Sequence, residues 1–99
     1  MKTRLSWDET KREENLAKHG LDFADAGEVL DSLYRLDIPV VRNGESRLQS
    51  ISYALGFLAV LTVVHTGRDG ATRIISFRRA SKLEREVYDA WLENEFDES

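Results

Sequence analysis

Two turn signals in the middle of the chain constrain its fold more than any other feature. Asn43-Gly44 is a residue pair typical of tight β-hairpin turns, and residues 67–70 (Gly-Arg-Asp-Gly) form a second turn sequence. Between them lies Phe57–Thr66, an almost unbroken apolar run with the length of a strand buried on both faces. We therefore predict an antiparallel meander of three or four strands, with Phe57–Thr66 as its central strand.

The neighbouring strands are predicted from the residues around these turns. Leu33–Val41 and Leu48–Leu55 flank the first turn and should form a hairpin, and Ala71–Phe77 should return beside the central strand. Pro39 has no backbone N–H to donate, so Leu33–Val41 is expected at an edge of the sheet.

Helix-capping residues predict two helices before the meander. Asp8 and Gly20 are the start and stop signals of a helix over Glu9–His19. Asp22 precedes a shorter helix over Phe23–Leu30, in which apolar residues form one face.

A third helix is predicted after the meander. Ser81-x-x-Glu84 is a capping box, in which each side chain bonds the backbone N–H of the other residue. The helix that follows is expected to pack on the sheet through residues spaced four apart, namely Leu83, Val87 and Trp91.

The order of these elements determines the expected fold class. Helices that precede and follow a run of antiparallel strands indicate an α+β fold with the helices packed on one sheet face. We predict a single domain over residues 1–99, in which residues 93–99 form an acidic, disordered tail.

The basic residues are concentrated in the middle of an acidic chain. Residues 42–82 carry seven Lys/Arg against two Asp/Glu, a net charge of +5. Residues 1–41 carry six against nine, or −3, and residues 83–99 carry one against seven, or −6. Six of the seven central cations are Arg, whose guanidinium matches phosphate oxygens. A solvated sheet face is the plain alternative, but this block favours RNA as a partner.

Several other classes of protein are disfavoured by the sequence. There is no Cys, and hence no disulfide framework or thiolate chemistry. We find neither a Gly-rich phosphate loop nor a zinc-ligand spacing, so no metal and no cofactor is predicted. The longest apolar stretch, Ala54–Val64, is too short to span a bilayer, and residues 1–5 lack the apolar run of a signal peptide. We expect a cytoplasmic protein with no membrane partner.

A set of short motifs occurs in order between residues 5 and 88. It comprises Trp7-Asp8, Lys11, Asn15, Lys18-His19-Gly20, Phe23, Ala26, Glu45-x-Arg47, the run Arg73–Ala80, Glu84-Arg85 and Tyr88. In this order the motifs resemble the BrnT family of toxins from type II toxin–antitoxin pairs. The resemblance implies a RelE-like fold and a metal-independent endoribonuclease that cleaves mRNA by attack of a 2′-hydroxyl on phosphate and so arrests growth. It also implies a hetero-oligomer with a small DNA-binding antitoxin of the BrnA kind.

The resemblance implies four catalytic residues. Glu45 and Arg47 share a strand face, either as a base beside a phosphate clamp or as a surface ion pair of little value. Arg78 and Arg79 are adjacent on a strand and therefore point to opposite faces. We predict that at most one of these two arginines faces the substrate, while the other pairs with an acid, for instance on the last helix.

Further cations are predicted to bind RNA, namely Lys18, His19, Arg68 and Arg73. For His19 the alternative is a hydrogen bond to the last carbonyl groups of its helix. His65 is a candidate acid or base, since its ordinary pKa lies near neutrality, but it belongs to none of the motifs.

Two further functions remain open on the sequence. The chain could be a non-catalytic interaction module that binds an antitoxin or another protein, or a nucleic-acid binder that does not cleave. The acidic residues 93–98 could also fold back onto the basic sheet and inhibit it. If the chain is a toxin, the antitoxin should be acidic where it covers Arg47, Arg78 and Arg79.

Overall fold

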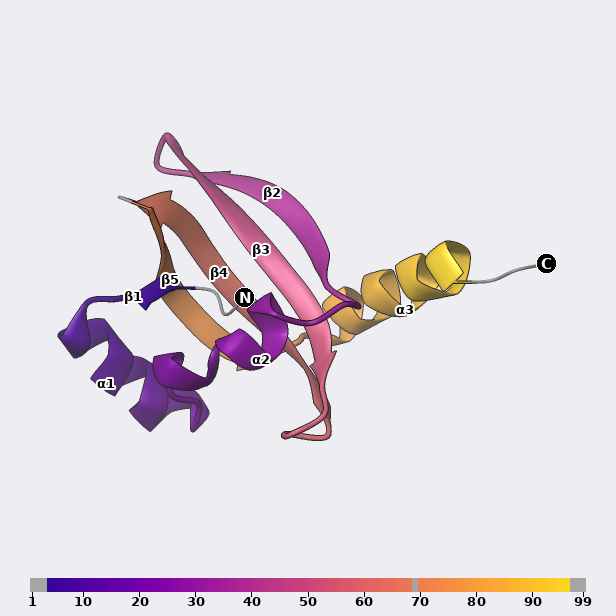
Figure 1. Cartoon of the computed structure of the whole chain (residues 1–99), viewed down its shortest axis with the longest axis horizontal. Helices are drawn as coiled ribbons and strands as arrows, with labels where there is room; N and C mark the ends of the chain where they lie inside the picture. The colour runs from indigo at the N-terminus through magenta and orange to yellow at the C-terminus, as the bar shows by residue number, and fades with distance from the viewer. Residues whose placement is uncertain (1–3, 69, 97–99) are drawn as a thin grey trace.

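A five-stranded mixed sheet forms the frame of the molecule, in the order β1-β5-β4-β3-β2 (Figure 1). The computed structural model describes residues 4–68 and 70–96. β1 runs parallel to β5, and all other neighbours are antiparallel. The predicted α+β class is confirmed. The strands are β1 (Leu5–Ser6), β2 (Leu36–Arg42), β3 (Glu45–Ala54), β4 (Ala59–Arg68) and β5 (Ala71–Arg79).

The predicted meander is present, with β4 as the middle strand of the sheet. β4 begins at Ala59 instead of Phe57, because residues 55–58 make the turn and Leu58 has a φ of 53°. The expectation of three or four antiparallel strands was wrong in one respect, since β1 adds a short parallel strand beside β5. Two residues are too few to show a strand pattern in the sequence.

The first hairpin turns where the sequence predicts it. Asn43 and Gly44 have φ values of 53° and 77°, and positive φ at both positions matches the twist of the flanking strands. Pro39 lies in β2, which is an edge strand as expected.

The N-terminal helices cover one face of the sheet. In α1 (Glu9–His19) the Asp8 carboxylate accepts a hydrogen bond from the N–H of Lys11, and Gly20 ends the helix at a φ of 71°. The predicted second helix is divided at Ala26 into a 3₁₀ turn, η1 (Phe23–Asp25), and α2 (Gly27–Leu30). The core lies between these elements and the sheet, and its largest fully buried members are Phe23, Val29, Leu61, Val63, Ile74 and Phe77.

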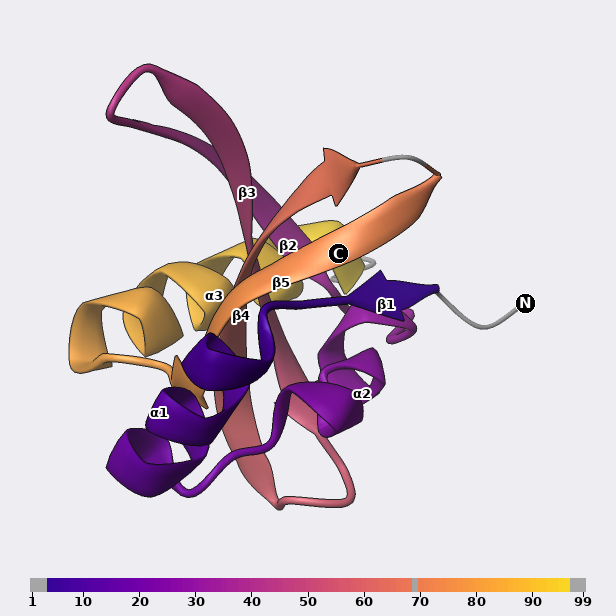
Figure 2. The ribbon, with the colours of Figure 1, turned by 90° about the vertical axis from the view of Figure 1, so that its left-hand side faces the viewer.

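The C-terminal helix α3 (Lys82–Phe96) packs on the opposite face (Figures 1 and 2). Its N-terminal turn contacts Thr62 and Arg78. Each of these is next in the strand to a core residue, Val63 or Phe77, and adjacent strand residues point to opposite faces of the sheet. The expectation of helices on a single sheet face was therefore wrong. The capping box is confirmed, because Ser81 N–H donates to Glu84 at 2.9 Å and Glu84 N–H donates to Ser81 Oγ at 3.1 Å.

The predicted contact face of α3 was also wrong in part. Leu83 is 69% exposed and Val87 is 43% exposed, whereas Tyr88 is 1% exposed and stacks at a tilt on Trp91. The Tyr88 hydroxyl donates to the carbonyl of Tyr34 at 2.7 Å. The buried face of α3 is thus centred on Tyr88, one position further along the helix than Val87.

The acidic C-terminal segment is helical as far as the structure describes it. α3 continues to Phe96, so residues 93–96, expected to be disordered, belong to the helix, and residues 97–99 lie outside the described residues. Figure 1 shows this end of α3 directed away from the sheet. Within residues 4–68 and 70–96, no helix is long and apolar enough to cross a membrane.

Candidate functional site

A polar depression of about 310 Å³ lies where β3, β4, β5 and α1 meet. Its lining includes Glu45 and Arg47 of β3, Arg73 of β5 and Lys11 of α1. Thr66 of β4, the register partner of Arg73, lines it as well. Three cationic side chains and one carboxylate therefore line the same depression, which suits the binding of a phosphate group beside a proton acceptor.

Glu45 and Arg47 form the centre of this depression. Arg47 Nε donates to Glu45 Oε1 at 2.7 Å, as their shared strand face predicts. Within the described part of the chain, the Nη groups of Arg47 have no hydrogen-bond partner, so they remain available to an oxygen ligand.

Lys11 was not assigned to the site from the sequence, although it belongs to the motifs quoted above. It lies in the first turns of α1, and its backbone N–H bonds the capping carboxylate of Asp8. The packing of α1 against β5 brings its side chain to the depression. Its position in the sequence, far from β3 and β5, gives no sign of this proximity.

Arg78 lies outside the depression and is paired with α3. Its Nη1 and Nη2 donate to the two oxygens of Glu84 at 2.7 and 2.8 Å. This two-point hydrogen bond, opposed by burial, lowers the pKa of Glu84 to about 2. The prediction that one of the two adjacent arginines pairs with an acid of the last helix is confirmed.

Arg79 points to the other face of the sheet and is exposed. Among the described residues it has no carboxylate partner. Lys18 and His19 end α1, and the charge of Arg78 acts on His19. Burial, then the positive charges of Lys18 and Arg78, lower the pKa of His19 below its ordinary value. None of these residues lines the depression.

Two predicted RNA contacts have different outcomes. Arg73 lines the depression, as described above. Arg68 lies at the end of β4, but its side chain is outside the described part of the structure.

His65 does not face the depression. It is 4% exposed, and its Nε2 lies 2.7 Å from Ser50 Oγ, which itself donates to Asp37 Oδ1 at 2.6 Å. The hydroxyl proton of Ser50 is thus committed to Asp37, so His65 is the donor to Ser50. Burial, and then the charge of Arg35, lower the pKa of His65. This arrangement is a satisfied hydrogen-bond chain that runs from buried His65 and Ser50 to the exposed carboxylate of Asp37.

Among the described residues, no group of three or more His, Cys, Asp or Glu side chains is arranged so that it could hold a metal ion. The ionisable side chains that line the depression are Lys11, Glu45, Arg47 and Arg73.

Comparison with protein families connects this geometry to a known class. Residues 7–84 match the family described as "Ribonuclease toxin, BrnT, of type II toxin-antitoxin system". The chain belongs to the BrnT family. No curated protein matches it significantly.

The BrnT match includes every residue of the depression and the pair formed by Arg78 and Glu84. It confirms the resemblance inferred from the motifs. It also places the chain in a family of ribonuclease toxins that operate within type II toxin–antitoxin pairs.

Proposed function

We propose that this BrnT chain is a metal-independent endoribonuclease that cleaves mRNA in the polar depression. One observation supports the proposal, namely that Lys11, Arg47 and Arg73 line the same depression as Glu45, whose carboxylate accepts a hydrogen bond from Arg47. The substrate is a single strand of RNA, whose bases and 2′-hydroxyl groups are accessible. Because the substrate is mRNA, the site of action is the cytoplasm.

The proposed reaction needs no group beyond the chain and the RNA. Glu45 takes the proton of a 2′-hydroxyl as its oxygen attacks the adjacent phosphorus. Arg47 and Arg73 stabilise the extra negative charge on the phosphoryl oxygens, which is commonly the largest contribution to such catalysis. The bond from phosphorus to the 5′-oxygen then breaks, and Lys11 protonates that oxygen. The products are a 2′,3′-cyclic phosphate and a 5′-hydroxyl end.

The remaining predicted residues act on the RNA outside the depression. We propose that Lys18, His19, Arg68 and Arg79 contact its phosphates, and that Arg78 acts indirectly by holding the end of β5 to α3 through Glu84. Support comes from the exposure of Arg79 and from the position of His19 within the field of Arg78.

The partner of the toxin is an antitoxin, as the family description implies. We propose a small DNA-binding protein that forms a hetero-oligomer with this chain and covers the depression with carboxylates. Cations that are buried without compensating charge are costly, so an acidic contact surface is the physical requirement there.

Cleavage of a labelled single-stranded RNA by the purified chain tests the proposed activity. Glu45→Gln should lower the cleavage rate by about 10²–10⁴-fold, because it removes the proton acceptor and keeps the shape. Arg47→Ala should lower it by about 10²–10³-fold, since a donor to the transition state is lost. Arg85→Ala is the matched control, because Arg85 is exposed on α3, and it should cleave at the wild-type rate.

A chelator distinguishes the proposed mechanism from a metal-dependent one. EDTA should leave the rate unchanged, and the product should end in a cyclic phosphate. Cleavage that persists in Glu45→Gln would reject the assigned role of this residue.

A non-catalytic interaction module is the second candidate function. It is favoured by the ion pairs that hold Arg47 and Arg78 in the absence of RNA. Expression of the chain in bacteria separates the two, because only the ribonuclease should arrest growth and be relieved by the antitoxin. A chain that neither cleaves RNA nor arrests growth, yet binds the antitoxin, would establish the interaction module.

A further inference from the structure

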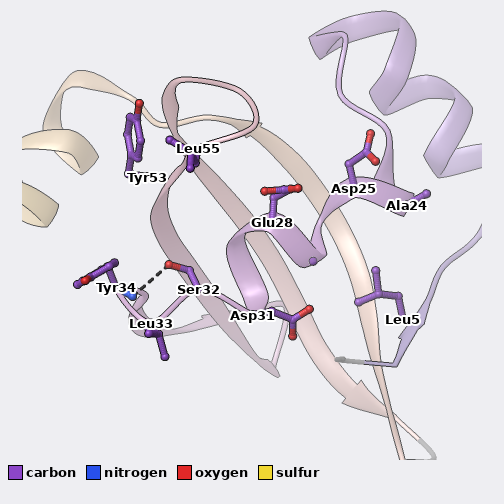
Figure 3. Close-up of a pocket in the computed structure, with 11 residues that line it drawn as sticks. Leu5, Ala24, Asp25, Glu28, Asp31, Ser32, Leu33, Tyr34, Tyr53 and Leu55 are labelled. Carbon is purple, nitrogen blue, oxygen red and sulfur yellow. Dashed lines mark hydrogen bonds between the residues drawn. The ribbon is translucent and has the colours of Figure 1, made fainter. Parts of the chain in front are cut away.

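A second depression, of about 700 Å³, lies on the side of the molecule covered by α2 (Figure 3). Its side chains come from η1 and α2, from the segment 32–34 that follows them, and from the end of β3. It shares no lining residue with the polar depression of the proposed active site. The proposed reaction therefore leaves this surface unexplained.

The rim of this depression is apolar and exposed. Leu33 is 88% exposed, Leu55 is 75%, Tyr34 is 50% and Tyr53 is 44%. An adjoining apolar depression of about 380 Å³ shares both tyrosines and extends to Leu92 of α3. The two depressions adjoin at Tyr34 and Tyr53, and we call them together the tyrosine groove. Exposed apolar side chains gathered in a groove are typical of protein interaction sites.

Hydrogen bonds hold the walls of the tyrosine groove in place. Tyr88 donates to the carbonyl of Tyr34 at 2.7 Å and accepts from the N–H of Tyr53 at 3.2 Å. Ser32 Oγ accepts from Tyr34 N–H at 3.0 Å, and Ser52 donates to the same oxygen at 2.8 Å. The groove is thus formed before any partner arrives, which reduces the entropy lost on binding.

The floor of the groove is acidic and determines the charge of its partner. Asp25, Glu28 and Asp31 all line it. Asp25 and Glu28 have no cationic partner among the described residues, and the Glu28 carboxylate lies over Gly56, where an added Cβ would be 3.5 Å from its oxygens. Carboxylates repel phosphate groups, so the occupant is not RNA. A partner needs apolar side chains for the rim and Lys or Arg for the floor.

We propose that the tyrosine groove is a docking site for a cationic, amphipathic segment of the antitoxin. This inference rests on the proposed antitoxin partner and is independent of RNA cleavage. It gives the antitoxin two contact regions of opposite charge, with acidic residues over the polar depression and basic residues in the groove. Two opposite charge patterns at separate sites define the orientation of the partner.

Titration of the antitoxin into chain variants by calorimetry tests the charge of the groove. The probe is the purified antitoxin of this toxin–antitoxin pair. The double variant Asp25→Lys/Glu28→Lys should raise the dissociation constant by about tenfold or more. Glu13→Lys/Glu14→Lys, the matched control on the exposed face of α1, carries the same charge change and should alter it by less than about twofold.

A second pair of variants tests the apolar rim and guards against misfolding. Leu33→Ser and Leu55→Ser should each raise the dissociation constant by about tenfold, because each removes an apolar side chain that the partner would cover. Both side chains are largely exposed in the unbound chain, so these changes should leave its folding intact. If the lysine pair does not fold by circular dichroism, Asp25→Asn/Glu28→Gln replaces it, with a smaller loss of affinity expected.

Wild-type affinity in all groove variants would overturn the inference, as would failure of the wild-type chain to bind the antitoxin. Self-association through the groove, with antitoxin binding unchanged in the variants, would overturn it too. RNA cleavage by each variant without antitoxin is measured separately and should match the wild type. If the wild-type chain does not cleave RNA, the ribonuclease proposal is rejected, whereas the antitoxin-binding measurements still test the docking site.

Discussion

At the residue scale, Glu84 makes most of the polar contacts between α3 and the sheet. Its two oxygens accept hydrogen bonds from both Nη groups of Arg78, from Thr62 at 3.1 Å and from the side-chain amide of Gln49. The backbone N–H of Ser81 adds another at 2.9 Å. The carboxylate is 16% exposed, so its charge is partly withdrawn from water and depends on these donors.

Replacing Glu84 by Gln should lower the free energy of unfolding by about 2 kcal/mol at pH 7, because Arg78 loses its counter-charge at a partly buried site. Urea denaturation measures this change. Glu86→Gln, on an exposed position of the same helix, should change this free energy by less than about 0.5 kcal/mol.

The folded pKa of Glu84, about 2, lies below the ordinary value of 4.5. The stabilisation is therefore present above pH 4.5, and the difference between wild type and Glu84→Gln should shrink as the pH falls from 4.5 towards 2.

His65 should respond to pH in the same direction from a different cause. Burial lowers its folded pKa below the ordinary value of 6.5, so the unfolded chain takes up a proton first as the pH falls. Stability should decrease from pH 6.5 downwards until the folded pKa is passed. The imidazole proton resonances of His65 should titrate below 6.5 in an NMR pH series. A measured pKa at or above 6.5 would contradict the buried, neutral state.

At the scale of elements, one side chain connects α1 to the edge of β5. Asn15 donates to the carbonyls of Leu21 and Phe77 at 2.9 and 2.8 Å and accepts from the N–H of Phe77 at 3.1 Å. β1 pairs with β5 only at Thr72 and Arg73, so Asn15 takes the place of a strand further along this edge. This contact places α1, and with it Lys11, against β5.

Asn15→Ala should lower the free energy of unfolding by about 2 kcal/mol, because the buried N–H and C=O of Phe77 lose their partner. Asn15→Asp should be at least as harmful, since a carboxylate cannot donate to the two carbonyls. Asn94→Ala, on the exposed end of α3, is the control and should be nearly neutral. Urea denaturation gives the energies, and faster amide exchange at Phe77 would locate the effect. Equal stability of Asn15→Ala and wild type would show that α1 is held by apolar contacts alone.

At the scale of the whole molecule, the charge is divided between separate surfaces. The net charge is −4, yet the polar depression is lined by three cations and one carboxylate, and the tyrosine groove has an acidic floor. An acidic molecule with a small basic site should bind RNA at that site and weakly elsewhere. This distribution makes a quantitative prediction for salt.

The three cations of the depression should contribute about −2 to the slope of the logarithm of the RNA association constant against the logarithm of salt concentration, since about 0.7 counterions are released per phosphate contact. The phosphate contacts proposed for Lys18, Arg68 and Arg79 outside the depression should make the total slope steeper. Arg73→Ala should reduce the slope by about 0.7. Fluorescence anisotropy over a salt range of about 50–300 mM measures the slope for the wild type and for the variant. The exposed Arg85 again supplies a control variant with an unchanged slope. Binding that is insensitive to salt would argue against phosphate contacts.

Local features of the fold were predictable because their causes lie within a few residues. The φ values at Asn43 and Gly44, the cap of α1 by Asp8 and the reciprocal bonds of Ser81 and Glu84 all follow from neighbouring residues. The alternation of strand side chains likewise predicts opposite directions for adjacent arginines. The ordered motifs were sufficient to recognise the family as well.

Long-range features depended on tertiary packing. The sheet face on which α3 lies depends on the Arg78–Glu84 pair and on the burial of Tyr88. The spacing of apolar residues along the helix was equally compatible with a buried face centred on Val87, so it could not identify this packing. Lys11 reaches the depression only because α1 docks on β5.

The sequence alone thus determined most of the helices and strands but not β1, together with their capping and turns, the family, and the chemical character of the candidate residues. The tertiary structure decided which of those residues meet. It brings Glu45, Arg47 and Arg73 to one depression, places Arg78 against α3, and gathers Asp25 and Glu28 below an apolar rim. The physical reason is that periodicity and capping are short-range effects, whereas contact between distant residues depends on how whole faces pack.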